Sequence, residues 1–555
     1  MIKKLMITLG KIFSLRQTSI LGAAFVIMVM VSTSRVLGLI RDRMLAARFS
    51  PDELGIYFAA FRIPNLVFEL LVMGAITVAF IPVFTEYQTI KGKDAAWKLA
   101  SSVINIGILL FIIFTIPIFI YSYELCRLIA PGFKEAELLK MVTFTRIMLL
   151  AQVFPLIIGN FFTGILQSFK HFLIPALAPV AYNFGIILGI FFLTPLFGLY
   201  APVYGVVIGA ILFMIIQIPL TFSLGYKHYR CLNLSDSGVK EVGKLMLPRT
   251  FGLAVAQIDT TVDLILSTTL AQGARMVTIF TFAQHLQQLP VGLFGATIAQ
   301  AALPTLAEIK SKENLDDFKN TFLASFNQIL FLVLPVSVML IILRVPIVRL
   351  VFGASHFDWE ATVLTGKTLA FFAVSLFAQS VVQLLARGFY ALYDSKTPVI
   401  IGIISVLINT VLSIFFINNL VLPIWGLAIS TSIASIANAG LLLIFLDRKV
   451  HQFARIRLIL PAVKIFIASF ITGIALYVPM KLLDQLVFDT TRTINLIALT
   501  GIATFIGLVV YLFLAWFLEI EEVVIFYNLA KKITRVPTRL IETSQEVVNG
   551  VGGEI

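Results

Sequence analysis

The sequence contains few charged residues and very few cysteines for its length. Only 13% of its 555 residues are Asp, Glu, Lys or Arg, and its mean hydropathy is +0.99. A soluble protein carries about 25% charged residues, so this composition excludes a soluble multidomain protein and a disordered chain. Two cysteines, Cys126 and Cys231, exclude a disulfide framework and a four-cysteine metal site. The topology predicted below places them on opposite sides of a membrane, and we therefore expect no disulfide.

Motifs that mark enzyme active sites are also missing. The chain has no P-loop, no GxSxG, no HExxH and no Cys/His cluster with metal-ligand spacing. We therefore expect that the protein is not an enzyme. A membrane glycosyltransferase or a lipid phosphatase is the enzymatic alternative, but such enzymes carry clustered polar residues in aqueous loops, and the loops here are short. Without a nucleotide site, transport would depend on an ion gradient or the membrane potential, or would be passive.

Long apolar runs dominate what the sequence does contain. Residues 104–121, 401–417 and 496–518 are examples, and their length suits a membrane-spanning helix. Barrel strands alternate apolar and polar residues, so the predicted fold class is an all-α polytopic membrane protein. A signal peptide at residues 21–31 is the alternative for the first run, but a charged helix end follows it. Fourteen spans are predicted, near residues 20–41, 54–86, 102–121, 141–168, 172–194, 202–224, 245–270, 277–306, 322–343, 364–391, 397–417, 423–446, 461–480 and 495–518.

Basic residues set the orientation of these spans. The two termini and the even-numbered loops hold more than twice as many Lys and Arg residues as the odd-numbered loops. The positive-inside rule then places both termini in the cytoplasm. The formal net charge of +13 is mainly this bias, and we expect no binding of nucleic acid.

An internal repeat relates the first six spans to the next six. Residues 79–86 (AFIPVFTE) resemble residues 301–308 (AALPTLAE), and residues 202–205 (PVYG) resemble residues 423–426 (PIWG) at nearly the same offset. Six spans return the chain to the same side, so the two copies enter the membrane in the same direction. Transporters built this way hold their substrate between the halves and expose it alternately to either side. A gene duplication without moving parts is the alternative.

The repeat predicts the domain organisation. It consists of a cytoplasmic N-terminus (1–19), an N-lobe (20–224), a C-lobe (225–446), two further spans (447–518) and a cytoplasmic tail (519–555). The tail mixes apolar and basic residues, and we expect it to lie on the inner membrane surface.

Polar residues inside predicted spans are the candidates for function. They are Arg35, Arg41 and Asp42 in the first span, Arg62, Asn65 and Glu69 in the second, Arg249, Asp259 and Asp263 in the seventh, Gln284, His285, Gln287 and Gln288 in the eighth, and Gln379, Gln383 and Arg387 in the tenth. Charges at membrane depth usually face a cavity or a partner. Arg35 and Asp42 are seven residues apart and share a helix face. Because Asp42 is the one carboxylate near two arginines, a positive surplus remains, which favours an anionic, phosphate-bearing substrate.

Structural roles are the alternative for several of these residues. Arg62 and Glu69 have the spacing of an internal ion pair. Arg249 is positioned to anchor its helix at the cytoplasmic headgroups. Asp259 and Asp263 are one helical turn apart, and they would take a cation or a proton, or pair with Arg249.

Four motifs carry a resemblance to a known family. They are residues 34–42 (SRVLGLIRD), 60–65 (AFRIPN), 288–295 (QLPVGLFG) and 388–398 (GFYALYDSKTP). Together they resemble the lipid II flippase family (MurJ, also called MviN) of the multidrug/oligosaccharidyl-lipid/polysaccharide exporter superfamily. The resemblance extends from about residue 20 to residue 518 and includes fourteen spans in the same order.

The resemblance implies a function and a site. The family moves the undecaprenyl-pyrophosphate-linked peptidoglycan precursor, lipid II, from the inner to the outer leaflet of the bacterial cytoplasmic membrane by alternating access. Arg35 and Arg41 match the arginine pair of its first span, which faces the pyrophosphate. The predicted headgroup site is Arg35, Arg41, Asp42, Arg62, Asn65, Arg249 and His285. The two spans within residues 447–518 are expected to form the groove for the lipid tail.

The chain departs from the family pattern at three polar positions. Phe68, followed by Glu69, stands where many members have an arginine, and Gly55 replaces an aspartate. His285 occupies the position of an arginine in the eighth span. Its alternative role is that of a hydrogen-bonded packing residue, but beside an anionic lipid it would become cationic.

The resemblance also predicts partners and a coupling ion. Some family members hold sodium among spans 7, 11 and 12. Asp263 and Asn409 resemble two of its ligands, whereas Ser413 replaces an expected carboxylate. No other cofactor is expected. The predicted partners are the undecaprenyl-linked substrate, membrane lipids and the wall-synthesis machinery, and we expect a monomer.

Other functions remain open at this stage. An exporter of the same fold for lipid-linked O-antigen or teichoic-acid units is one alternative, and the altered polar contacts keep it open. An exporter of cationic drugs is another, although such proteins usually have twelve spans. A structural role in wall assembly is the third.

Overall fold

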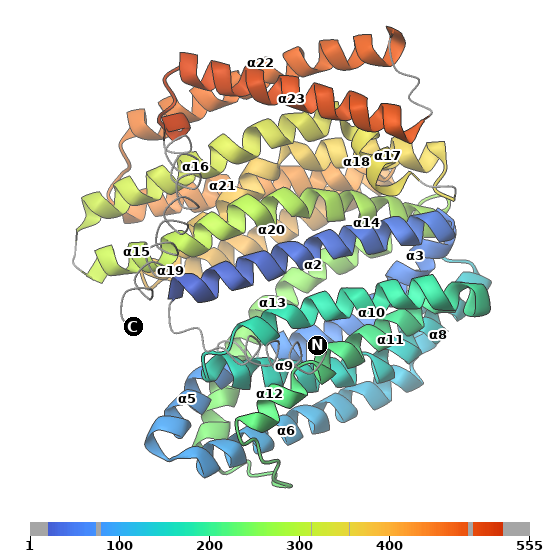
Figure 1. The fold of residues 1–555 in the computed structure, drawn as a ribbon, viewed down its shortest axis with the longest axis vertical. Coiled ribbons are helices and arrows are strands. Elements are labelled where there is room, and N and C mark those ends of the chain that lie inside the picture. The colour runs from blue at the N-terminus through green and yellow to red at the C-terminus, as the bar shows by residue number, and fades with distance from the viewer. Residues whose placement is uncertain (1–19, 74–78, 312–313, 354–355, 487–491, 525–555) are drawn as a thin grey trace, which may run out of the picture. The chain divides into compact units, whose positions relative to one another are not determined.

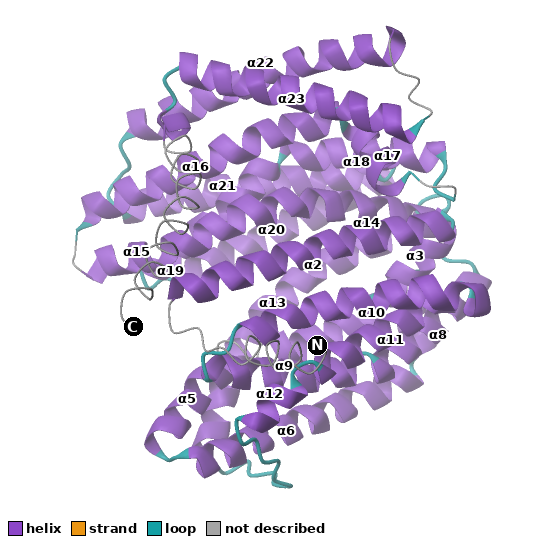
Figure 2. Ribbon diagram, in the orientation of Figure 1, coloured by secondary structure: helices purple, strands orange, loops and turns teal. Residues whose placement is uncertain are grey.

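The computed structural model describes residues 20–73, 79–311, 314–353, 356–486 and 492–524. Helices are the regular secondary structure throughout this part of the chain (Figure 2), which confirms the predicted all-α fold class. The predicted N-terminal segment 1–19, residues 74–78 of the second predicted span and most of the predicted tail lie outside the described residues.

The described helices coincide with the predicted spans. Among these residues, eleven helices are long and apolar enough to cross a membrane, or twelve when two consecutive helices bent by 44° are counted as one span. α2 (Ile20–Arg48) and α13 (Ser237–Thr269) coincide with predicted spans 1 and 7, and both carry charged residues along their length. The chain is therefore a polytopic helical membrane protein, and the number fourteen stays a prediction.

The chain divides into two compact units. Unit 1 consists of the described residues within 1–289, 347–372 and 399–434, and unit 2 of those within 290–346, 373–398 and 435–555. These boundaries differ from the lobes expected from the repeat, so the division into N-lobe and C-lobe stays a prediction.

Unit 1 holds most of the helices labelled in Figure 1. Besides α2 and α13, they are α3 (Pro51–Ala60), α4 (Arg62–Phe68), η1 (Glu69–Met73), α5 (Ile81–Ile90), α6 (Lys93–Ile120), α7 (Ser122–Ile129), α8 (Glu135–Ala151), α9 (Val153–Ser168), α10 (Leu173–Phe197), α11 (Tyr200–Ile215), α12 (Ile218–Ser223), α14 (Gly273–Pro290), most of α17 (Arg344–Phe352), most of α18 (Trp359–Val374), most of α20 (Lys396–Ile414), η4 (Phe415–Asn419) and the first part of α21 (Trp425–Lys449).

Prolines explain where several spans break. The second span is interrupted at Phe61, three residues before Pro64 of the short α4. The fourth is interrupted at Gln152, three residues before Pro155, and α14 passes into a π-helical turn at Pro290. Proline lacks the amide hydrogen that would continue the helix ladder. α16 (Leu315–Ile342) nevertheless continues through Pro335.

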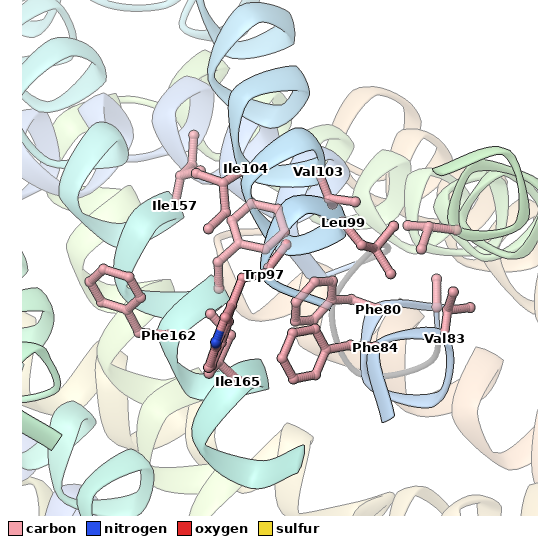
Figure 3. Packing of buried hydrophobic residues seen from close by; sticks show 14 of the residues in the cluster. Phe80, Val83, Phe84, Trp97, Leu99, Val103, Ile104, Ile157, Phe162 and Ile165 are labelled. Atoms are coloured by element: carbon pink, nitrogen blue, oxygen red, sulfur yellow. The ribbon is translucent and has the colours of Figure 1, made fainter. Parts of the chain in front are cut away.

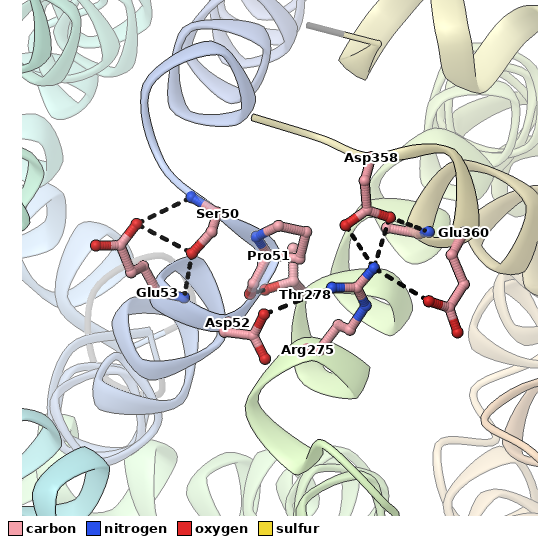
Figure 4. Close-up of polar contacts among 9 residues, drawn as sticks. Ser50, Pro51, Asp52, Glu53, Arg275, Thr278, Asp358 and Glu360 are labelled. Carbon is pink, nitrogen blue, oxygen red and sulfur yellow. Dashed lines mark hydrogen bonds and ion pairs between the residues drawn. The ribbon is translucent and has the colours of Figure 1, made fainter. Parts of the chain in front are cut away.

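The start of α3 is fixed by its local sequence (Figure 4). Ser50 and Glu53 form a reciprocal capping box, and Pro51 occupies the first helical turn. Nearby, Arg275 of α14 lies within ion-pair distance of carboxylates on two other segments. The distances are 3.6 Å to Asp52, 2.5 Å to Asp358 and 3.6 Å to Glu360. These bonds tie the start of α3 to the starts of α14 and α18.

An aromatic core holds α5, α6 and α9 together in unit 1 (Figure 3). Phe80 and Phe84 stack with ring centroids 5.3 Å apart, and Trp97 stacks on Phe169 at 5.7 Å. Such ring pairs contribute about 1 kcal/mol beyond the burial of their area.

α10 packs closely against α11 and against α2. Glycines make the first contact possible: a Cβ at Gly185 or Gly189 of α10 would collide with the backbone of Gly209 or Gly205 of α11. Small residues at facing positions allow membrane helices to approach backbone to backbone. The α10–α11 pair therefore forms the rigid support behind the first span.

Unit 2 contains η3 (Val291–Ala296), α15 (Thr297–Ser311), α16, α19 (Leu376–Ala391), α22 (Arg455–Leu486) and α23 (Thr493–Phe517). α22 packs against both α16 and α23. The Tyr511 hydroxyl of α23 donates to the Phe331 carbonyl of α16 at 2.7 Å. The outer faces of α22 and α23 carry exposed aromatic residues such as Phe470 and Phe505, as expected for surfaces that contact lipid.

Candidate functional site

A polar cavity of about 390 Å³ lies within unit 1. Its walls come from α2, α3, α4, α10, α13 and α14. The lining residues are Arg41, Tyr57, Phe58, Phe61, Arg62, Asn65, Tyr182, Thr260, Leu264, Ser267, Val277, Phe280, Thr281, Gln284 and His285. Two arginines and a histidine thus face one space whose other walls are aromatic rings, uncharged polar groups and two aliphatic side chains.

Asp42 joins two of these cationic groups. The Arg41 guanidinium donates through Nε and Nη2 to Asp42 Oδ1, at 2.9 and 2.8 Å. The other carboxylate oxygen, Oδ2, lies 2.8 Å from His285 Nδ1. Asp42 is only 2% exposed, so the network of bonds fixes its position. Charge-assisted bonds of this kind are short and strong, and here they aim Arg41 and His285 at the cavity.

Asn183 of α10 supports Arg41 from the other side. Arg41 Nη1 donates to Asn183 Oδ1 at 3.1 Å, and Asn183 Nδ2 donates to the Ser34 hydroxyl at 3.1 Å. Asn183 was not among the candidate residues predicted from the sequence. Its position inside an apolar span was the available signal that it belongs to the site.

Arg62 is held by α13. Its Nε donates to the Thr261 hydroxyl at 2.9 Å, and its Nη2 donates to the Gln257 carbonyl. The side-chain amide of Gln257 in turn donates to Glu69. Gln257 therefore lies between Arg62 and Glu69, for which a direct ion pair was the alternative. Arg62 lines the cavity together with Asn65.

Arg35 faces a second cavity of unit 1, of about 370 Å³. It lies between α2, α9 and α10, and its other walls are mainly apolar. Arg35 also donates to the Gln288 carbonyl at 3.2 Å. Gln288 and His285 are both on α14, so the expected shared face of Arg35 and Asp42 is confirmed. The predicted pair Arg35 and Arg41 does not line one cavity.

The remaining predicted headgroup residue is Arg249, whose side chain lies outside the described part of the structure. Sequence reasoning missed the aromatic wall of the main cavity. Tyr57 and Tyr182 approach Arg41 from α3 and α10, and Phe58 meets the His285 ring edge to face at 6.1 Å. Aromatic residues inside spans are too common to signal a site on their own.

The predicted sodium ligands come together in a second polar cluster of unit 1. The Asn409 amide donates to Asp259 Oδ1 at 2.7 Å, and the Ser413 hydroxyl lies 3.5 Å from Asp263 Oδ1. Ser413 also lies 2.6 Å from the Ser430 hydroxyl. Asp263, Asn409 and Ser413 are buried. Carboxylate, amide and hydroxyl oxygens are hard donors, so this set fits a hard cation.

Comparison with known proteins identifies the family. A sequence profile described as lipid II flippase MurJ matches residues 53–496. This chain belongs to the MurJ family. The probable lipid II flippase MurJ of Bdellovibrio bacteriovorus is 28% identical over 509 residues, which is 91% of this chain and 96% of the relative. The lipid II flippase MurJ of Burkholderia cenocepacia is 29% identical over 441 residues, covering 75% and 81% of the two chains.

Solved structures agree with the MurJ family assignment. A structure of lipid II flippase MurJ in an inward closed conformation matches with a TM-score of 0.74 and 25% identity, covering 88% of this chain and 98% of that chain. An inward-facing multidrug resistance MATE family transporter of the MOP superfamily matches with a TM-score of 0.66 at 16% identity, covering 77% and 98%. The second likeness concerns the fold alone.

The structure accounts for two departures from the MurJ pattern. A Cβ at Gly55 would collide with the backbone carbonyl of Ala274, so an aspartate does not fit where α3 meets α14. Phe68 packs against the two hydrophobic clusters of unit 1, where an arginine would be costly. The third departure, His285, stays in the cavity and keeps a polar partner in Asp42.

Proposed function

We propose that this protein is a flippase for lipid II, which it moves from the inner to the outer leaflet of the bacterial cytoplasmic membrane. The observation that carries the proposal is the Arg41–Asp42–His285 network at a polar cavity within a MurJ-family chain. The cavity offers cationic groups inside an apolar protein, where attraction to a pyrophosphate is weakly screened.

The side chains have distinct roles in this proposal. Arg41 and Arg62 bind pyrophosphate oxygens, because guanidinium groups recognise phosphate with paired hydrogen bonds. Asp42 orients Arg41 and His285 rather than touching the substrate. Asn65 and the uncharged polar groups of the wall contact the sugar–peptide part. Arg35, at its separate cavity, attracts the headgroup along α2 on its way to or from the main cavity.

Transport proceeds by alternating access, without a catalytic step. Both termini lie in the cytoplasm, the headgroup enters from the inner leaflet, and the prenyl tail stays in lipid beside α22 and α23. The bias of basic residues toward one side supports this orientation. The protein acts as a monomer, and the wall-synthesis machinery takes up the product.

Sodium is part of this proposal. Asp263, Asn409 and Ser413, with Asp259 and Ser430 beside them, would hold the ion. Bound sodium would supply a positive charge that offsets the two carboxylates of α13. These residues lie on α13, α20 and α21, so occupancy of the site would favour one packing of these helices over another.

The test is complementation of a bacterium depleted of its own lipid II flippase. The readout is labelled lipid II that becomes accessible at the outer leaflet. We expect the wild-type chain to restore accessibility and Arg41→Gln to reduce it at least tenfold, whereas Arg230→Gln, an exposed basic residue outside the cavity, leaves it unchanged. Wild-type protein that is folded and inserted but restores nothing would overturn the proposal, and other undecaprenyl-pyrophosphate-linked glycans would then be the substrates to test.

A further inference from the structure

A third cavity, of about 570 Å³, lies at one end of unit 2, where the chain turns from α21 into α22. It belongs to neither cavity of unit 1. Its lining residues are Leu443, Ile444, Asp447, Arg448, His451, Gln452, Arg455 and Leu458. The turn is the loop between predicted spans 12 and 13, which the positive-inside rule places on the cytoplasmic side.

The turn is built around one buried carboxylate. Asp447 is 7% exposed and accepts hydrogen bonds from the Phe453 amide at 2.7 Å and from Arg455 Nη2 at 2.9 Å. His451 and Gln452, at the tip, both have left-handed backbones, with φ of 56° and 70°. Consecutive left-handed residues other than glycine are costly and tend to persist at binding sites. Asp447 therefore holds Arg455 and the strained tip in place.

The cavity carries a surplus of positive charge. Arg448 and Arg455 face it, and Asp447 is the one carboxylate in its lining. The neighbouring Lys449 does not add to this surplus, since it lies 2.5 Å from Asp394. Arg448 contacts the face of the Phe445 ring, 6.0 Å from its centroid. This contact leaves the guanidinium edge available for a ligand.

Apolar surface continues from the cavity along the two helices. Leu443, Ile444 and Leu458 form its apolar wall. On the same helices, Ile444, Ile456 and Ile459 are 50%, 76% and 54% exposed. Anionic lipid headgroups bind to basic pockets that lie beside exposed apolar helix surfaces at the cytoplasmic face of the membrane.

We propose that this cavity binds the phosphodiester headgroup of an anionic phospholipid such as phosphatidylglycerol. The phosphate accepts hydrogen bonds from Arg448, from Arg455 and from the side-chain amide of Gln452. One acyl chain lies along Ile444 and the other along Ile459. The site is separate from the cavities of unit 1, so this inference does not depend on which headgroup the protein transports.

The test uses the purified full-length chain in detergent and native mass spectrometry with added phosphatidylglycerol, phosphatidylcholine, undecaprenyl pyrophosphate or inorganic phosphate. We expect wild type to retain phosphatidylglycerol at least tenfold better than phosphatidylcholine, and inorganic phosphate at millimolar concentration not to displace it. Arg448→Gln and Arg455→Gln should each reduce retention of phosphatidylglycerol about tenfold, the effect of losing one charged hydrogen-bond donor. Arg230→Gln is the matched control and should bind as wild type does.

Arg455→Gln removes a bond to Asp447 and could perturb the fold. In that case Arg448→Gln is the informative variant, because Arg448 makes no bond to Asp447 in the structure. Equal retention of both phospholipids, or unchanged binding in Arg448→Gln, would overturn the proposal. Displacement by inorganic phosphate would make the cavity a site for free anions, and displacement by undecaprenyl pyrophosphate would make it a site for the substrate lipid. Either result would replace the phospholipid assignment.

Discussion

Asp42 bridges Arg41 and His285, with one carboxylate oxygen on each partner. The Asp42 carboxylate offsets one positive charge at the cavity, and Arg62 contributes another. A side chain with a permanent positive charge at position 285 would therefore add to an existing positive surplus.

We therefore expect binding of undecaprenyl pyrophosphate, measured at one fixed pH, to depend on the charge at position 285. In His285→Arg, which carries a permanent positive charge, binding should be retained. In His285→Gln, which is neutral, binding should be about tenfold weaker than in His285→Arg. Titration calorimetry on the wild-type protein and the two variants measures this. Equal binding by His285→Arg and His285→Gln would contradict this role.

Gly55→Ala tests the close approach of α3 and α14. The added methyl group would meet the Ala274 carbonyl, which cannot rotate away, so the free energy of unfolding should fall by about 1 to 3 kcal/mol. Gly402→Ala is the matched control, because open space surrounds that position within α20. Its melting temperature in detergent should equal or slightly exceed that of wild type, since alanine favours the helix. A stable Gly55→Ala variant would contradict the contact.

Asp394→Asn tests the start of α20. Burial opposes ionisation of this carboxyl, but hydrogen bonds from Lys449 and Thr397 outweigh it and lower the pKa of Asp394 to about 2, from an ordinary 3.8. A carboxyl group whose pKa is lower in the folded state stabilises the fold at pH values above its pKa in the unfolded state. This stabilisation is lost as the pH falls through about 2. The variant should therefore melt below wild type at about pH 6, and the difference should vanish near pH 2.

Asp316→Asn provides the comparison for Asp394→Asn. Asp316 also pairs with a lysine, Lys319, but its side chain is 88% exposed. Exposed pairs contribute little, so this variant should melt like wild type at every pH. If the melting temperature of Asp316→Asn fell as far as that of Asp394→Asn, the effect would not be specific to the bonds of Asp394.

Sodium should raise the melting temperature of the wild-type protein when it replaces choline at equal ionic strength. Asp263→Ala should abolish this effect, because it removes a carboxylate of the buried cluster. Ser413→Ala should reduce it. Ser337→Ala removes another buried hydroxyl, one bonded to the backbone of its own helix, and should leave the sodium effect intact. Equal stabilisation of wild type and Asp263→Ala by sodium would exclude these residues as ligands.

Apolar runs were enough to predict the helices, because a span must satisfy its backbone within itself. The shared face of Arg35 and Asp42 was also predictable, since seven residues make almost two whole turns. Six residues separate Arg35 from Arg41 and rotate them by about 120°, which is why they reach different cavities. Spacing along one helix thus predicts which residues share a face, but not what lies opposite that face.

Contacts between distant segments could not be predicted in this way. His285 and Asp42 are 243 residues apart, and only the packing of α14 on α2 brings them together. Likewise, Gln257 of α13 bonds to both Arg62 and Glu69, although it is far from them in the sequence. The cluster of Asp263, Asn409 and Ser413 was predictable as a set only through the family resemblance, because its residues come from two separate spans.

The glycine contacts between α10 and α11 have a mechanical consequence. The backbones touch at Gly185 and Gly189, so neither helix can slide past the other without collision. The two helices therefore move together as one rigid body. Asn183 is also on α10, two residues from Gly185, and its amide oxygen accepts a hydrogen bond from Arg41. A tilt of α11 would therefore be transmitted through α10 to the Arg41 guanidinium and would change the shape of the cavity that Arg41 lines.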